Sequence, residues 1–244
     1  MKKVFLAILA TIAVVGMVSC NKDDNGKGGK KGGKTAVVVD VTIDGNFDDW
    51  KDVPVAAEID EDVAPGRDSL LTLKVGADSK NLYVYYEFIM PEGNPYVPVD
   101  IFIDSDGDKT TGFSAWLWEI GWEFLLESET GCLENATTVR NMDDMTIYKA
   151  GTWKDAQGVQ IGGWDAAAVQ EKLTTTGFLR SAGKVDKGIG FVEISIERSA
   201  INARAKGTIG FGIEVHVGSW RDNGILPQYP ADEVKIDALQ VALP

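Results

Sequence analysis

Three aspartates at alternate positions form the part of the sequence that is best suited to bind a metal ion. Asp104, Asp106 and Asp108 surround Gly107 in a short polar loop. Carboxylate oxygens are preferred ligands of Ca²⁺, and a tight loop can turn three carboxylates at this spacing towards one ion. An EF-hand would have a glutamate at its twelfth position, where this sequence has Ala115, so a neighbouring strand would have to supply further ligands. The alternative is a solvated hairpin turn, since Asp and Gly are also common turn residues.

Tryptophans in loops that contain glycine form a second set of candidate binding residues. The C–H groups of a sugar ring stack on an aromatic face, while its hydroxyls form hydrogen bonds with nearby carboxylates and amides. A loop tryptophan with charged and amide neighbours can therefore bind a polysaccharide or oligosaccharide, although it can also simply plug the loop. The candidates are Trp220 with Arg221, Asp222 and Asn223 as first choice, Trp164 as second, and then Trp153 and Trp116.

A further tryptophan-rich segment, residues 116–126, has the two-residue alternation of a β-strand. An aromatic strand face can bind a sugar or form the inner wall of a β-sandwich, and we favour the inner wall for Trp122. A tryptophan nearer the aspartate loop can reach a rim. Trp50, which is not in this segment, is expected in the core. The predicted aromatic face contains Trp116, Trp118, Ile120, Trp122 and Phe124.

No arrangement of residues indicates an enzyme. The sequence shows no serine, cysteine or metal–histidine constellation, and scattered carboxylates in an acidic chain do not identify a glycosidase pair. The 244 residues include 37 acidic and 24 basic side chains, which gives a net charge of −13. A surface of this charge repels nucleic acid and anionic lipid. We therefore expect a non-catalytic protein that does not bind nucleic acid.

The N-terminal residues are expected to export the protein rather than to fold. Two lysines precede an apolar run over residues 4–18, which is shorter than the roughly 20 residues of a membrane span. Residues 17–20, Met-Val-Ser-Cys, resemble a bacterial lipobox, in which the cysteine is acylated and becomes the first mature residue. We therefore expect a signal peptide over residues 1–19 and a lipid, including palmitate, on Cys20. The alternative is an uncleaved anchor with an incidental cysteine.

A flexible tether is expected over residues 20–35. After Cys20 the tether is rich in glycine and lysine and has no apolar residue, so it cannot bury surface. Its opening, residues 21–24, resembles the acidic signal that sends some outer-membrane lipoproteins to the cell surface. We expect an outer-membrane anchor that faces the cell exterior, with the periplasmic face as the alternative. Acylation of Cys20 would leave Cys132 without a cysteine partner, which excludes an intrachain disulfide.

Residues 36–244 are expected to form one all-β domain. Many short strands separated by Gly, Asn and Asp indicate an antiparallel β-sandwich of the jelly-roll or immunoglobulin-like type, or a barrel. The one convincing helical patch is residues 165–173, with Asp165 as a possible N-cap. Strands are expected at residues 71–75, 82–89, 99–104, 116–126, 145–149, 190–196, 208–217 and 234–241.

Several motifs resemble the family 9 carbohydrate-binding modules and the related DOMON sandwiches. Ile43-Asp44-Gly45 with Asp48-Asp49-Trp50 is similar to the opening of these domains, and Asn81-Leu82-Tyr83-Val84 is similar to one of their strands. The motifs follow the family's order as far as Val217, after which the sequence departs from the pattern. The matching segments are residues 43–50, 73–84, 103–112, 121–124, 192–196 and 209–215.

The resemblance implies a β-sandwich that binds a glycan between two tryptophans, and it makes a stabilising calcium ion plausible. DOMON relatives include haem binders, so His216, the only histidine, is a candidate axial ligand on the strand face of Gly212 and Glu214. A hydrogen-bonded strand histidine is the alternative. We predict a lipid-anchored protein that captures a glycan at the cell surface. The alternatives are a haem-binding or electron-transfer subunit and an accessory protein of a membrane complex.

Overall fold

The structure of the protein, a computed structural model, consists almost entirely of β-strands. Apart from them it contains one 3-10 helix, η1 (Phe47–Trp50), among the residues it describes. None of the described helical residues forms a segment long and apolar enough to cross a membrane. The described residues are 37–60, 69–90, 97–114, 117–128, 133–135, 138–139, 146–149, 171–173, 177–216, 224–229 and 235–244.

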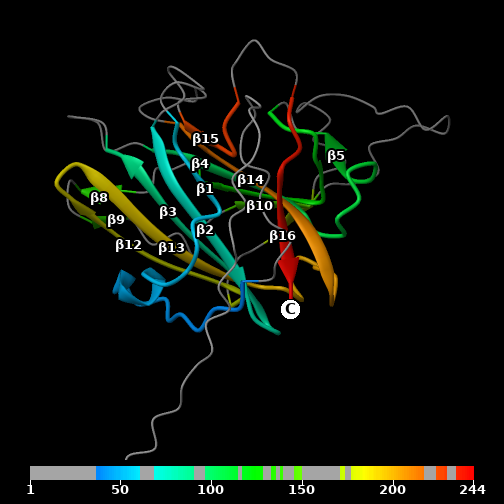
Figure 1. The fold of residues 1–244 in the computed structure, drawn as a ribbon, viewed down its shortest axis with the longest axis horizontal. Coiled ribbons are helices and arrows are strands. Elements are labelled where there is room, and N and C mark those ends of the chain that lie inside the picture. Colours follow the sequence, from blue (N-terminus) through cyan, green and yellow to red (C-terminus); the bar gives the residue numbers. More distant parts are fainter. Residues whose placement is uncertain are drawn as a thin grey trace, which may run out of the picture.

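Two antiparallel sheets, here named sheet A and sheet B, make up the domain (Figure 1). Within the described ranges each sheet has seven strands, and a short hairpin of β5 (Phe113–Ser114) and β6 (Gly121–Trp122) stands apart. In sheet A the order is β1 (Ala57–Glu58), β2 (Leu70–Ala77), β3 (Asn81–Ile89), β13 (Ile189–Glu197), β12 (Leu179–Asp186), β9 (Thr138–Val139) and β8 (Leu133–Asn135). In sheet B it is β11 (Glu171–Leu173), β10 (Thr146–Lys149), β7 (Phe124–Ser128), β4 (Val99–Asp104), β14 (Gly207–Val215) and β15 (Gly224–Leu226), and β16 (Leu239–Leu243) also pairs with β14.

The main core lies between the two sheets and is built from alternate residues of their strands. Val84 and Tyr86 on β3 and Ile101 and Ile103 on β4 belong to one apolar cluster and are fully buried. Because strand side chains alternate between faces, the residues between them point to the outer face of each sheet. The predicted all-β antiparallel sandwich is confirmed.

Each outer face carries a second apolar layer, which positions the polar groups discussed below. On sheet B, Phe102 and Trp118 belong to a buried cluster formed with the β5–β6 hairpin and residues near the C-terminus. On sheet A, Trp50 packs at 5.3 Å from the Tyr85 ring and belongs to a third buried cluster. Trp50 is 1% exposed, so its predicted burial is confirmed, although it lies outside the space between the sheets.

The predicted continuous strand over residues 116–126 is wrong. Residues 121–122 pair with β5, Glu123 leaves the ladder, and β7 begins at Phe124 and pairs with β4. This interruption places Trp122 in the outer layer of sheet B and Phe124 in the main core, so the two residues do not share a face. Trp122 is fully buried as predicted, but it is not on the inner wall of the sandwich.

Two further predicted elements, one helical patch and one strand, differ from the structure. Residues 171–173 of the predicted helical patch form strand β11, which pairs with β10, while residues 165–170 lie outside the described residues. Pairing with a strand that is distant in sequence overrides the weak local helix propensity of this segment. The predicted strand over residues 234–241 begins only at Leu239 in the described chain, as β16. Strand β12 was not predicted, because its sequence, Leu-Arg-Ser-Ala-Gly-Lys-Val-Asp, has few apolar residues.

Candidate functional sites

All seven residues of the predicted glycan site lie outside the described part of the chain. Trp220, Arg221, Asp222, Asn223, Trp164, Trp153 and Trp116 lie outside the described residues, as does the predicted lipidation residue Cys20. The predicted metal-binding loop and His216 are described. The candidate sites are therefore groups of polar residues that the structure describes on the faces of the two sheets.

The aspartate loop follows directly after β4 and is closed by its own side chains. Asp104 Oδ1 accepts hydrogen bonds from the backbone N–H groups of Gly107, at 2.6 Å, and Asp108, at 3.1 Å. Gly107 has a φ of +69°, and a Cβ there would lie 2.1 Å from the carbonyl oxygen of Thr208. Glycine is therefore required at this turn, both for its φ and for the close approach to β14.

Glu123 completes an acidic cluster that the sequence did not indicate. Carboxylate oxygens of Asp104, Asp106 and Glu123 all lie within 4.8 Å of one another. Glu123 reaches the loop because its Oε2 accepts the Ser105 N–H at 2.8 Å. The predicted third ligand, Asp108, is not in this group, and its carboxylate accepts hydrogen bonds from the Thr110 N–H and hydroxyl. The structure thus brings two of the three predicted aspartates together with Glu123.

The electrostatics of this cluster favour a cation. Burial and then the nearby charge of Glu123 raise the pKa of Asp104 from 3.8 to about 7. Burial, opposed by the Ser105 hydrogen bond, raises the pKa of Glu123. Carboxylates that are forced together in this way can lower their repulsion either by taking up a proton or by binding a hard cation such as Ca²⁺.

A second polar cluster, Asp100, Glu214 and His216, lies on the outer face of sheet B. Asp100 on β4 is directly opposite Glu214 on β14, and His216 follows two residues later on the same face. The His216 Nε2 atom is 3.4 Å from Asp100 Oδ2 and 3.7 Å from Glu214 Oε2. On the far side of Asp100, Glu127 on β7 occupies the opposite position, and it is also buried.

The cluster is held firmly by its surroundings. The three residues are between 0% and 4% exposed, and the backbone N–H of His216 donates to the Pro98 carbonyl at 2.9 Å. Burial raises the pKa of Asp100, while its contact with His216 has the opposite effect. Sequence alternation predicts that His216 lies on the face of Glu214, and the structure confirms it. Asp100 was missed, because only the register between β4 and β14 brings it to them.

The aromatic layer of sheet B borders this cluster. Trp118 packs edge-on against Phe102 at 5.7 Å, and its indole N–H donates to the Pro227 carbonyl at 2.9 Å. A Cβ at Gly212 would lie 2.6 Å from the Trp118 ring, so glycine is needed on β14 for the ring to lie flat on the sheet. Trp118 is fully buried and therefore supports the site rather than offering a free stacking surface.

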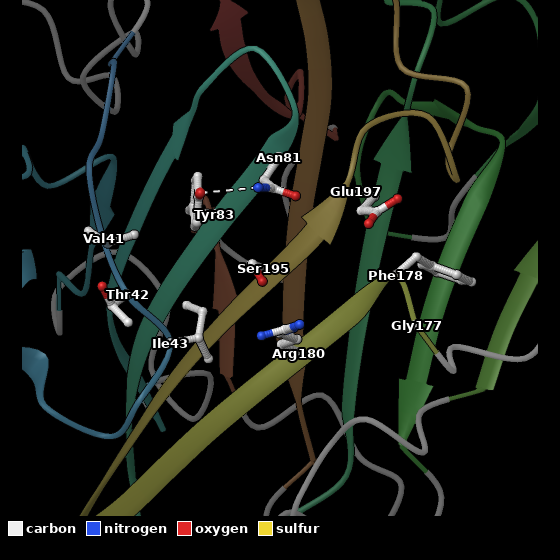
Figure 2. Close-up of a pocket in the computed structure, with 10 residues that line it drawn as sticks. All are labelled: Val41, Thr42, Ile43, Asn81, Tyr83, Gly177, Phe178, Arg180, Ser195 and Glu197. Atoms are coloured by element: carbon white, nitrogen blue, oxygen red, sulfur yellow. Dashed lines mark hydrogen bonds between the residues drawn. The ribbon is translucent and has the colours of Figure 1, made fainter.

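A shallow pocket of about 320 Å³ lies on the outer face of sheet A (Figure 2). The strand register places Ser195 between Tyr83 and Arg180, and these residues form its floor. Figure 2 shows Tyr83 accepting a hydrogen bond from Asn81. Among the described residues Arg180 forms no ion pair within 4.0 Å, so its guanidinium can meet a polar ligand. The lining residues are Val41, Thr42, Ile43, Asn81, Tyr83, Gly177, Phe178, Arg180, Ser195 and Glu197.

Comparison with known proteins identifies eight similar chains of solved structures, including the two described next. No family model and no curated protein matches the sequence. Both structures are carbohydrate-binding modules of family 9 from Caldicellulosiruptor kristjanssonii. The one in complex with cellotriose is 17% identical, with 76% of this chain and 76% of that chain covered and a TM-score of 0.40. The one in complex with glucose is 16% identical, with 78% and 81% covered and a TM-score of 0.41.

Proposed function

We propose that the protein binds a glycan without catalysing a reaction, and that its site lies on the outer face of sheet B at Asp100, Glu214 and His216. The observation that carries this proposal is the row of polar side chains across β4 and β14, which are at most 4% exposed and must be uncovered for a sugar to reach them. Each carboxylate offers about four lone-pair positions to hydroxyl donors, and sugars are rich in such donors. Sites for small polar ligands typically combine a few convergent groups of this kind with apolar walls.

The covalent chain supports the same location for the predicted tryptophan. Trp220 and its neighbours Arg221, Asp222 and Asn223 belong to the segment that connects His216 with Gly224. Both ends of this segment lie at the cluster, since Gly224 is opposite Val215 in the β14–β15 pair. We therefore assign Trp220 and the carboxylates to one site, in which the tryptophan stacks on the sugar ring and the carboxylates accept its hydroxyls.

The proposal is tested by measuring glycan binding in affinity electrophoresis and by calorimetry, with glucose, cello-oligosaccharides and a broad glycan panel. Asp100→Asn and Glu214→Gln preserve side-chain size but remove a charged acceptor, so each is expected to weaken binding on the order of 10- to 100-fold. Trp220→Ala is expected to weaken binding as well, because it removes the stacking surface.

The matched control is Glu197→Gln, which makes the same chemical change at an exposed residue of the sheet A pocket. It should leave glycan binding unchanged. If Arg180→Ala abolished binding while Asp100→Asn did not, the site would lie on sheet A instead. If no glycan of the panel bound to the folded protein, glycan capture would be the wrong function.

We also propose that a calcium ion stabilises the domain at Asp104, Asp106 and Glu123. Three carboxylates within 4.8 Å, one of them from the bend between β6 and β7, supply the oxygen ligands that this ion prefers. Asp108, predicted as a ligand, lies in the same loop and stays a candidate through its carboxylate or a bridging water. A calcium titration that is monitored by calorimetry tests this proposal. Glu123→Gln should remove most of the heat of binding.

Attachment to the outer membrane through Cys20 completes the proposed function. The lipobox-like residues 17–20 and the glycine-rich tether support a lipid anchor that lets the domain reach a large external ligand. In the producing bacterium, wild-type protein should partition into detergent and a Cys20→Ser variant should not. Digestion of the domain by protease added to intact cells would support the exterior face, and full protection would support the periplasmic one.

A further inference from the structure

We infer that Asp100, Glu214 and His216 form a binding site for a divalent transition metal such as Zn²⁺. This site is separate from the acidic loop at Asp104. It goes beyond the proposed function, because the three side chains would hold the metal whether or not a glycan binds. The inference rests on the placement, spacing and burial of the three groups.

Two paired strands place these side chains on a rigid surface. Asp100 and Glu214 are directly opposite each other in the β4–β14 pair, and His216 lies one further position along the same face. Both strands lie inside sheet B, where β7 and β15 pair with their other edges. A metal site on interior strands is better preorganised than one on a loop, because the backbone already holds the ligands in position.

The spacing of the ligand atoms fits one metal better than it fits hydrogen bonds. His216 Nε2 lies 3.4 Å from Asp100 Oδ2 and 3.7 Å from Glu214 Oε2. Good N–H···O bonds are usually about 2.7–3.2 Å long. Two ligands on one tetrahedral zinc, each about 2.1 Å from the ion, are roughly 3.4 Å apart. All three atoms lie within 4.8 Å of one another, so small side-chain rotations would bring them to one ion.

Asp100 provides an independent indication that something is bound here. It is 3% exposed, and its Oδ1 atom has no hydrogen-bond partner in the part of the chain that the structure describes. A buried carboxylate oxygen without a partner is costly, because it loses its hydration without compensation. A metal bound by this carboxylate would supply that compensation.

The donor set selects the class of metal. One imidazole nitrogen and two carboxylate oxygens suit Zn²⁺ and the neighbouring divalent transition metals, whereas Ca²⁺ prefers oxygen ligands alone. Three protein ligands leave a position for water or for a ligand oxygen, as in zinc sites that remain open. The cluster of Asp104, Asp106 and Glu123 offers only carboxylate oxygens among the described residues, so the two sites should differ in metal preference.

The test uses the purified full chain, freed of metal and titrated with ZnCl₂. Because His216 is the only histidine, its ring nitrogens give a single set of ¹⁵N resonances that reports this site alone. We expect zinc to shift these resonances with a stoichiometry of one. Titration with Co²⁺ should produce the visible absorption of a low-symmetry cobalt site. His216→Gln and Asp100→Asn should each lower zinc affinity on the order of 100-fold, since loss of a direct ligand costs at least as much as loss of an outer-shell partner.

Glu58→Gln is the matched control, because it removes an exposed carboxylate of β1 and should leave zinc affinity unchanged. Circular dichroism checks that each variant folds. If His216→Gln does not fold, the zinc affinity of Asp100→Asn tests the inference. If the His216 resonances did not shift when zinc was added, the inference would be wrong, even if zinc bound elsewhere, for example at Cys132. Equal zinc affinity in wild type and Asp100→Asn would also overturn it.

Glycan binding measured with and without zinc separates this inference from the proposed function. Zinc bound at His216 together with no glycan binding would overturn the proposed function alone. Glycan binding that depends on Asp100, without any zinc binding, would overturn the metal site alone.

Discussion

Glu123→Gln should have opposite effects on stability with and without calcium. Glu123 is the residue that turns an ordinary aspartate turn into a three-carboxylate cluster. Glutamine keeps an oxygen that can accept the Ser105 N–H, which Glu123 Oε2 now accepts at 2.8 Å. The substitution therefore removes mainly a negative charge. Without calcium this loss relieves repulsion, and with calcium it removes a ligand.

The size of the effect follows from the distance between the carboxylates. Oxygens of Asp104 and Glu123 lie within 4.8 Å of each other. At an effective dielectric constant of about 20, two charges at this distance repel by about 3 kcal/mol. Partial protonation of Asp104 near neutral pH already relieves part of this repulsion, because its pKa is raised to about 7. We therefore expect Glu123→Gln to stabilise the calcium-free protein by about 2 kcal/mol.

Urea unfolding at pH 7.5, followed by tryptophan fluorescence, measures both effects. In EDTA the variant should unfold at a higher urea concentration than wild type. In excess CaCl₂ the order should reverse, because wild type gains binding free energy that the variant lacks. Glu58→Gln changes the net charge by the same amount as Glu123→Gln, but at an exposed position. It should therefore change the unfolding midpoint neither in EDTA nor relative to wild type in CaCl₂. The reasoning would be refuted if CaCl₂ left the wild-type midpoint unchanged, or if both proteins unfolded together in EDTA.

Three further predictions concern groups that support the sites. Glu193→Ala should cost about 3 kcal/mol in urea unfolding, because the carboxylate accepts the Trp50 indole N–H at 2.9 Å and two backbone N–H groups; a loss below 1 kcal/mol would contradict this estimate. Gly107→Ala should destabilise by about 2 kcal/mol or more and weaken calcium binding, whereas Gly177→Ala, with a positive φ but no atom within 4 Å, should cost only about 1 kcal/mol. In EDTA, stability should fall as pH rises from about 4 through 7, because the folded pKa of Asp104 exceeds its unfolded value of 3.8 and the proton held in the folded state is lost in this window. If the free energy of unfolding of Asp104→Asn does not fall over this pH range, the fall in wild type is due to Asp104. If the variant shows the same fall as wild type, the explanation is wrong.

Local pattern was enough to predict the strands that build the main core. Residues 71–75, 82–89 and 99–104 show the two-residue alternation or the β-branched and aromatic composition of strands, and they form β2, β3 and β4. Alternation depends only on neighbours in the chain, so it is readable from sequence. The same reasoning placed His216 and Glu214 on one face, since they are two residues apart.

Tertiary structure decided which distant residues meet. Glu123 joins Asp104 because the chain leaves the ladder after β6, and that break also sends Trp122 and Phe124 to opposite faces. Residues 171–173 form an edge strand only because β10 is there to pair with them. Asp100 joins Glu214 and His216 through the register of β4 on β14. Strand register and sheet order arise from packing over the whole domain, and a one-residue change in register would move Asp100 to the opposite face. The sequence by itself therefore determined the fold class and the chemical types at the sites, while their grouping depended on the assembled sheets.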